Sequence, residues 1–133
     1  MRGSVRRAVR IQRSAEDVWA FIGDPARLHE WFPGIVATTV DGTSRVITTR
    51  MGLPMPEEIL TNDAIARRFQ YKLLIPVVKE HVSTLDVHDL GDGTCLATYA
   101  ADADPAAMAL IIGGAAGNAL ENAKQMLENG EPR

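Results

Sequence analysis

The sequence has very little cysteine or histidine. A single cysteine, Cys95, in 133 residues excludes an internal disulfide and a cluster of thiolate metal ligands. It falls within an expected strand, without a partner motif, which favours a small buried hydrophobic side chain. The three histidines are scattered and lack the spacing of metal ligands, so we predict no metal site.

Long apolar runs and a strong charge excess are missing as well. No window is apolar over the length that a membrane-spanning helix needs, and the N-terminal residues lack the apolar core of a signal peptide. A net charge of -3 and an isoelectric point near 5.6 give no broad basic surface for nucleic acid. We therefore expect a cytoplasmic protein with no integral membrane segment and no nucleic-acid partner.

The common catalytic motifs are absent. The sequence has no glycine-rich phosphate loop, no nucleophile elbow and no paired carboxylates expected inside a pocket. Gly113, Gly114 and Gly117 superficially resemble a dinucleotide fingerprint, but they fall inside an expected helix instead of between a strand and a helix. We predict no cofactor.

The composition is that of one soluble globular domain spanning residues 1–133, with 46% hydrophobic and 23% charged residues. A run of arginines crowds the expected first strand: Arg2, Arg6, Arg7, Arg10 and Arg13. Such a run is typical of a solvated strand edge, and a phosphate-binding or partner-binding patch is the alternative.

Residues 11–34 predict a strand end, two abutting short helices and a turn. Ser14 is a good N-cap, Asp17 stands at the capping-box position, and Val18, Phe21 and Ile22 follow at helical spacing. Asp24 and Pro25 then favour a second short helix, 26–31, which Pro33 and Gly34 end.

Strand patterns dominate the middle of the chain. Residues 35–40 and 44–49 predict a hairpin, 51–56 a proline-interrupted loop, and 57–60 another strand. Alternation in 67–75, 77–90 and 94–101 indicates half-buried strands. The faces expected to point inward are Phe69, Tyr71, Leu73 and Ile75, then Lys79, His81, Ser83, Leu85 and Val87, then Cys95, Ala97, Tyr99 and Ala101. Asp104 and Pro105 are expected to open a long helix that stops at Asn129-Gly130.

These elements predict an α+β fold in which a seven-stranded antiparallel sheet curls around one long C-terminal helix. The segment Ser-Ala-Glu-Asp-Val-Trp-Ala-Phe-Ile-Gly-Asp-Pro, followed by Trp31-Phe32-Pro33-Gly34, and the order of elements after it resemble the SRPBCC, or START-like, helix-grip superfamily. Its bacterial polyketide cyclase/dehydratase-like members are the closest in appearance. The resemblance covers nearly the whole chain.

A curved sheet around a helix can enclose an apolar cavity, and we predict a hydrophobic ligand of lipid, polyketide or aromatic type within it. The expected ligand-binding residues are Trp31, Met51, Met55, Phe69, Tyr71, Leu73, His81, Tyr99, Gly113 and Gly117. Each also has a purely structural interpretation. The helical glycines are equally consistent with close packing on the sheet or with a helix interface in a homodimer. Met51 and Met55 belong to a loop that is either a lid or a hydrophobic plug, and Trp31 either lines an entrance or holds the second helix on the sheet.

Two other functions remain open. The cyclase-like relatives imply an enzyme in which His81, with Tyr71 or Tyr99, moves protons during enolisation or dehydration. A single histidine on a strand face is also compatible with a simple structural hydrogen bond. The third possibility is a protein-interaction module that uses the arginine-rich strand or the glycine face of the long helix. That possibility predicts concentration-dependent association, which sedimentation would detect.

Overall fold

The computed structural model describes residues 1–130 and contains seven strands and four helical segments. In chain order these are β1 (Gly3–Ile11), α1 (Ala15–Ile22), the 3-10 turn η1 (Pro25–Arg27), α2 (Leu28–Trp31), β2 (Ile35–Asp41), β3 (Ser44–Thr49), β4 (Pro54–Asp63), β5 (Arg68–Leu73), β6 (Glu80–Asp89), β7 (Cys95–Asp104) and α3 (Ala106–Asn129). This is the predicted order, ended by the predicted long helix.

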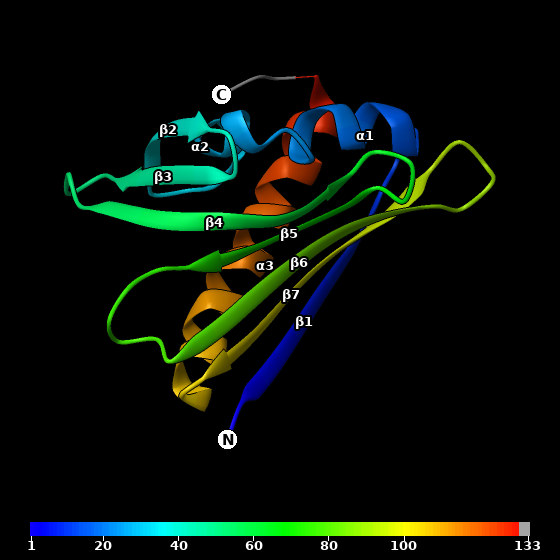
Figure 1. Cartoon of the computed structure of the whole chain (residues 1–133). Coiled ribbons are helices and arrows are strands. Elements are labelled where there is room, and N and C mark those ends of the chain that lie inside the picture. Colours follow the sequence, from blue (N-terminus) through cyan, green and yellow to red (C-terminus); the bar gives the residue numbers. More distant parts are fainter. Residues whose placement is uncertain (131–133) are drawn as a thin grey trace.

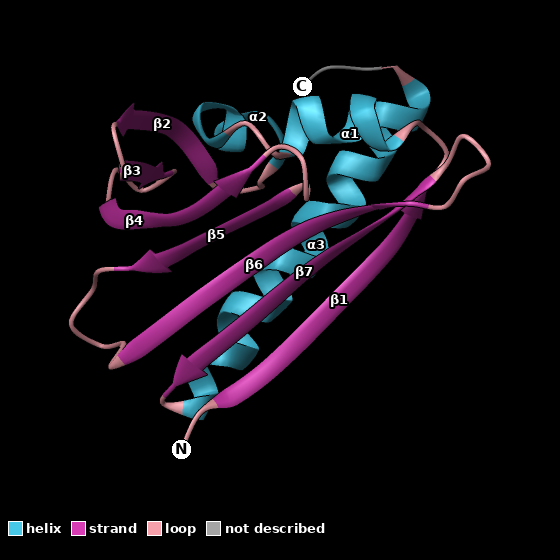
Figure 2. Ribbon diagram, turned by 45° about the vertical axis from the view of Figure 1, so that its right-hand side comes forward, coloured by secondary structure: helices cyan, strands magenta, loops and turns pink. Residues whose placement is uncertain are grey.

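The seven strands form one antiparallel sheet in the order β1-β7-β6-β5-β4-β3-β2. All neighbours in the sheet are consecutive in sequence except β1, which pairs with β7 along its whole length, from Gly3 opposite Ala103 to Ile11 opposite Cys95. The sheet curves around α3, which runs diagonally across its concave side (Figure 1). Figure 2 shows α1 and α2 beside the C-terminal end of α3. The helix-grip fold predicted from the sequence is confirmed.

Local signals explain where the helices begin and end. Ser14 accepts the backbone N–H of Asp17 at 3.1 Å, as the capping pattern predicts. Gly130 ends α3 with φ of 67°, a left-handed conformation that glycine adopts at little cost. The start of α3 differs from the prediction, because Pro105 occupies the N-cap and Asp104 is the last residue of β7.

Burial along the three central strands follows the predicted alternation. His81, Ser83, Leu85 and Val87 are buried on β6, although the outward Val82 breaks the polar pattern of the other face. Several strand boundaries differ from the prediction. β4 and β7 continue to Asp63 and Asp104, and β5 ends at Leu73, so the expected inward Ile75 is only half-buried beyond the strand and Lys79 is exposed ahead of β6. β4 begins at Pro54 and not at residue 57, since the prolines stand at its start, and β6 begins at Glu80 after a turn through residues 76–79.

The core lies between the concave face of the sheet and the helices. α3 packs on β1 and β7, whereas α1 and α2 cover the end of the sheet near β2, β6 and β7. Its largest fully buried side chains include Trp31, Arg45, Tyr99, Ile11, Leu85 and Leu120. Because Arg45 is one of these side chains, the core contains a buried charged group as well as apolar ones.

Candidate functional site

The structure brings six of the predicted ligand-binding residues onto or against the concave face. Phe69, Tyr71 and Leu73 come from β5, His81 from β6, Tyr99 from β7 and Trp31 from α2, and all are buried. The ring of Tyr71 lies 5.7 Å from that of His81, 5.8 Å from Phe69 and 6.5 Å from Tyr99. The ring of Trp31 lies 6.2 Å from that of Tyr99. These contacts define one aromatic cluster centred on Tyr71 and Tyr99.

His81 is held at both ring nitrogens. Its Nδ1 accepts the backbone N–H of Leu73 at 2.9 Å, and Nε2 lies 2.7 Å from Oγ of Ser83. In a neutral ring that accepts at Nδ1, the proton resides on Nε2 and is donated to Ser83. Burial lowers the pKa of His81 to about 4, against an opposing effect of Asp102, so the ring is neutral at pH 7.

The hydroxyl groups of Tyr71 and Tyr99, referred to below as the tyrosine pair, lie 2.5 Å apart. Burial raises the pKa of Tyr71 to about 12 and that of Tyr99 well above its ordinary value. A hydrogen bond from Ser83 lowers the pKa of Tyr71 and so opposes the effect of burial. Because Ser83 also contacts Nε2 of His81, it links the tyrosine pair to His81. Both phenols are therefore protonated donors at neutral pH.

An ion pair that the sequence analysis missed completes the site. Arg45 on β3 and Glu57 on β4 face each other in register, and Nε of Arg45 donates to Oε1 of Glu57 at 2.7 Å. Both residues are buried as deeply as the apolar core, with 2% of their surface exposed. Burial raises the pKa of the Glu57 carboxyl, and the Arg45 charge opposes that shift. The guanidinium stacks 4.7 Å from the Tyr71 ring and 5.0 Å from the Phe69 ring, so the pair adjoins the aromatic cluster.

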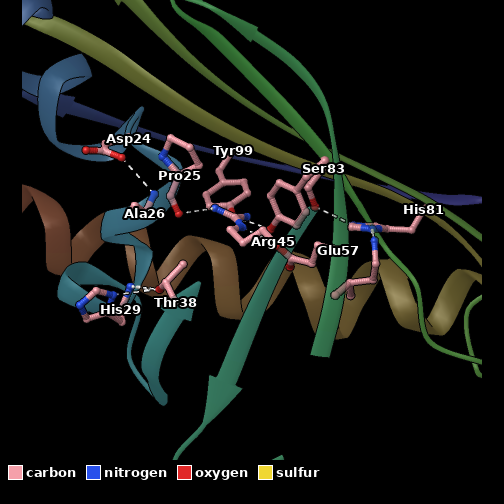
Figure 3. A network of polar contacts seen from close by, with 12 residues as sticks. Asp24, Pro25, Ala26, His29, Thr38, Arg45, Glu57, His81, Ser83 and Tyr99 are labelled. Atoms are coloured by element: carbon pink, nitrogen blue, oxygen red, sulfur yellow. Dashed lines mark hydrogen bonds and ion pairs between the residues drawn. The ribbon is translucent and has the colours of Figure 1, made fainter. Parts of the chain in front are cut away.

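Figure 3 shows the polar groups as a row that crosses the concave face from Pro25 through Arg45 and Ser83 to His81. Nη1 of Arg45 donates to the carbonyl oxygen of Pro25 at 3.2 Å, which ties the row to η1. Two buried polar atoms near it have no hydrogen-bond partner within residues 1–130, namely Nη2 of Arg45 and Nε1 of Trp31. Both belong to side chains that pack on the tyrosine pair.

The remaining predicted ligand-binding residues lie elsewhere. A Cβ atom at Gly113 would stand 2.5 Å from Val5, and one at Gly117 would stand 2.3 Å from the guanidinium of Arg7. These glycines therefore allow α3 to pack closely on β1 within the same chain. Met55 is half-buried against the core, whereas Met51 is 95% exposed at the β3–β4 turn.

Hollows open at the edges of this site. One of about 430 Å³ lies where β5 and β6 separate, beyond the pairing of Tyr71 with Ser83, and is lined by Leu73, Val78 and His81 among others. Another of about 300 Å³ is lined by Trp31, Phe32, Ile35 and Asn122, next to α2. Five hollows of about 240–640 Å³ lie along the described residues, and none of these five is lined by both α3 and the concave face of β5–β7. The aromatic cluster fills that space in this conformation.

A family model described as polyketide cyclase/dehydrase and lipid transport matches residues 2–128. The chain belongs to this family. The match covers every strand and helix except the last residue of α3, so the polyketide cyclase/dehydrase and lipid transport family supplies the scaffold for the site just described. No curated protein sequence matches the chain at a significant level.

Solved structures in the same fold agree along nearly the whole chain. The protein XoxI from Bacillus cereus superposes with a TM-score of 0.86 at 21% identity, over 92% of this chain and 94% of that one. Norcoclaurine synthase from Thalictrum flavum, in complex with a transition-state analogue, superposes with a TM-score of 0.77 at 16% identity, over 98% and 97%. A START superfamily protein from Mycobacterium smegmatis gives 0.70 at 16% identity, over 95% and 94%. At these identities the likeness establishes the fold.

Residues 1–130 contain neither a metal-binding cluster nor a membrane-spanning helix. No group of three or more His, Cys, Asp or Glu side chains in this range is placed to hold a metal ion. None of its helices is both long enough and apolar enough to span a bilayer.

Proposed function

We propose that this member of the polyketide cyclase/dehydrase and lipid transport family binds a hydrophobic small molecule, of lipid, polyketide or aromatic type, beside the tyrosine pair on the concave face of the sheet. The observation that carries the proposal is the row of buried polar side chains inside an otherwise apolar core. Burying Arg45 and Glu57 costs several kcal/mol of desolvation per ion, and an apolar pair of similar size would serve stability as well (about 1–4 kcal/mol better in measured cases). Hydrogen bonds from these polar groups to a ligand explain why they lie in the core despite that cost.

The surroundings suit an apolar ligand with a few polar contacts. The rings of Trp31, Phe69, Tyr71 and Tyr99 offer apolar faces, while Arg45 and the tyrosine pair offer donors. Ligand entry requires a side chain to move, because the cluster is packed. Phe32 is the best candidate: it is only half-buried, its ring lies 6.4 Å from that of Tyr99, and it lines the hollow beside α2.

Native mass spectrometry of the protein purified from its own host tests the proposal. We expect a mass increment from a non-covalent hydrophobic compound that organic extraction recovers. Displacement of this compound by added apolar ligands should change the fluorescence of Trp31, which lies in the cluster. A protein that carries nothing and binds no apolar ligand at its solubility limit contradicts the proposal.

The hydrogen bonds of His81, Ser83 and the tyrosine pair favour a second candidate, an enzyme of the cyclase/dehydratase kind. Because both nitrogens of His81 are engaged, its role would be to orient Ser83 and, through Ser83, the tyrosine pair, and a phenol would act on the substrate. In that case His81→Ala should abolish turnover and leave ligand affinity within a few-fold. Equal loss of both, or no turnover in the wild type, argues for binding alone.

A further inference from the structure

β1 leaves one edge of the sheet open. It is the outermost strand on the right of Figure 2, and within the described residues only β7 pairs with it. The backbone direction follows from β7, because the carbonyl oxygens of Thr94 and Asp104 accept from Leu90 and Lys79 on the β6 side. Backbone groups alternate in direction along a strand, so the odd-numbered residues of β7 bond to the odd-numbered residues of β1. The even-numbered residues of β1 therefore direct their N–H and C=O groups away from the sheet.

α3 covers the C-terminal part of this edge. Nζ of Lys124 donates to the carbonyl oxygen of Arg10 at 2.7 Å, and the side chain of Glu128 accepts the N–H of Gln12 at 2.8 Å. Both backbone groups belong to even-numbered residues, as the alternation requires. The outward backbone groups with no partner within residues 1–130 belong to three exposed residues: Ser4, Arg6 and Ala8. This segment, 4–8, is called the free edge below.

The arginines of the first strand differ in whether they are paired. Arg2, Arg10 and Arg13 each form an ion pair with an acidic side chain. Arg6 and Arg7, in the middle of the free edge, form no ion pair or hydrogen bond through their side chains within residues 1–130. The positive charge is therefore unbalanced at the same place where the backbone is unpaired.

These two guanidinium groups lie on opposite sides of the free edge. Arg6 is on the convex side and lines a hollow of about 370 Å³ whose carboxylates, Asp86 and Asp102, bond to other side chains. Arg7 is on the concave side, with its guanidinium against Gly117 of α3. A chain that lies along the free edge passes between two unpaired positive charges.

α3 adds an apolar contact beside the free edge. Gly117, Lys124 and Glu128 face β1 from one side of the helix. Leu110 precedes Gly117 by two helical turns and so shares that side. It is 69% exposed, and a strand added next to β1 would cover it.

Charge distinguishes the possible occupants of the free edge. Two copies of this chain that pair antiparallel along all of it are centred on Arg6, so Arg6 lies opposite Arg6 and Arg2 opposite Arg10. Like charges directly opposite each other destabilise a sheet, which disfavours a second copy. Nucleic-acid phosphates suit the arginines, but they carry only acceptors and cannot bond to the outward carbonyl oxygens. An acidic peptide supplies negative charge together with its own N–H and C=O groups.

We propose that the free edge of β1 binds an extended acidic segment of a partner protein, which adds to the sheet as an antiparallel eighth strand. An acidic side chain of the segment pairs with Arg6 on the convex side. Alternate apolar side chains lie on the concave side, against Leu110 and beside Arg7. The free edge lies outside the aromatic cluster, so this partner site does not depend on the proposed function.

The probe is a heptapeptide in which glutamate and valine alternate, blocked at both ends, and the experiment is an NMR titration of the full chain with amide hydrogen exchange. We expect the N–H groups of Arg6 and Ala8, which exchange freely without the peptide, to become protected. Those of Arg7 and Val9 already pair with β7 and should keep their protection. This contrast between neighbouring residues distinguishes an added strand from binding through charge alone.

Methylation of the peptide backbone tests the hydrogen bonds directly. With glutamate opposite Arg6 in an antiparallel pair, the glutamate N–H groups face β1 and the valine N–H groups face away. A peptide methylated at its glutamate nitrogens should bind about tenfold or more weakly, and one methylated at its valine nitrogens should stay within about threefold. Equal affinity of the two methylated peptides overturns the proposal.

Arg6→Gln should weaken binding of the unmodified peptide about fivefold, because it removes the ion pair and keeps a similar side chain. Arg50→Gln is the matched control, since Arg50 is exposed, forms no ion pair within residues 1–130 and lies far along the chain, just after β3. It should leave the affinity within about twofold. Equal effects of the two substitutions would show that Arg6 is not a specific contact and would overturn the proposal.

Three further results also overturn it. One is the absence of peptide binding at millimolar concentration. Another is a dimer in sedimentation of the free protein with Arg6 and Ala8 already protected, which would assign the free edge to a second copy. The last is an oligothymidylate that binds as tightly as the peptide and leaves both N–H groups unprotected, which would assign the arginines to phosphate.

Discussion

At the scale of single residues, Arg45 and Glu57 depend on each other. Arg45→Met leaves the Glu57 carboxyl buried and unpaired, so we expect a loss of about 3–5 kcal/mol in the free energy of unfolding, measured by urea denaturation. The double variant Arg45→Met/Glu57→Leu should recover most of that loss, because no charge is then left in the core. If the double variant is no more stable than Arg45→Met, the ion pair is not what makes the single substitution costly.

His81 gives the protein a predictable response to acid. Its pKa is about 4 in the folded chain and about 6.5 when unfolded, so between these values the unfolded state binds a proton that the folded state does not. Stability from this group is complete above pH 6.5 and falls by about 2–3 kcal/mol as the pH drops to 4. His81→Gln should flatten the dependence in that window, as measured by urea denaturation at a series of pH values. His29 and His88 remain in both proteins and cancel in the comparison.

Residue patterns predicted the buried aromatic side chains and His81, because period-two alternation fixes the inward face of a strand. They did not predict the Arg45–Glu57 pair. The register of β3 and β4 places these two residues opposite each other. We expected a loop over 51–56, whereas β4 begins at Pro54, so the pairing of β3 with β4 was not predicted. The unpartnered nitrogens of Arg45 and Trp31 result from three-dimensional packing, which no spacing in the sequence reports.

At the scale of elements, the glycines of α3 set its distance from β1. Gly113→Ala forces a Cβ against Val5, a strand side chain with little freedom, and should destabilise by about 1–3 kcal/mol through overpacking. Gly114→Ala meets nothing within 4 Å and should stabilise by about 0.5–1 kcal/mol through helix propensity.

Thermal unfolding of the two alanine variants side by side checks this prediction. Stabilisation by Gly113→Ala would show that α3 does not lie close to β1 at this point. The sequence alone did not distinguish close packing from ligand space at these glycines, because a helical glycine is compatible with both. Only the positions of Val5 and Arg7 distinguish them.

At the scale of the whole molecule, ligand binding should be visible as added stability. With an apolar ligand of the proposed site at 100 times its Kd, the free energy of unfolding should rise by about 2.7 kcal/mol, since the ligand binds only the folded chain. At the same concentration a Tyr71→Phe/Tyr99→Phe variant, which lacks both phenolic donors and is expected to bind about tenfold more weakly, should gain about 1.4 kcal/mol. Equal gains in both proteins would place the ligand away from the tyrosine pair.

The pairing of β1 with β7 ties the first strand to the last one. Gly3 pairs with Ala103, about a hundred residues later in the chain, so β1 has no strand partner until β7 has been synthesised. The arginines on β1 keep that waiting strand charged, which discourages it from pairing with another nascent chain. The sheet is therefore expected to take in β1 only after β7 has been synthesised.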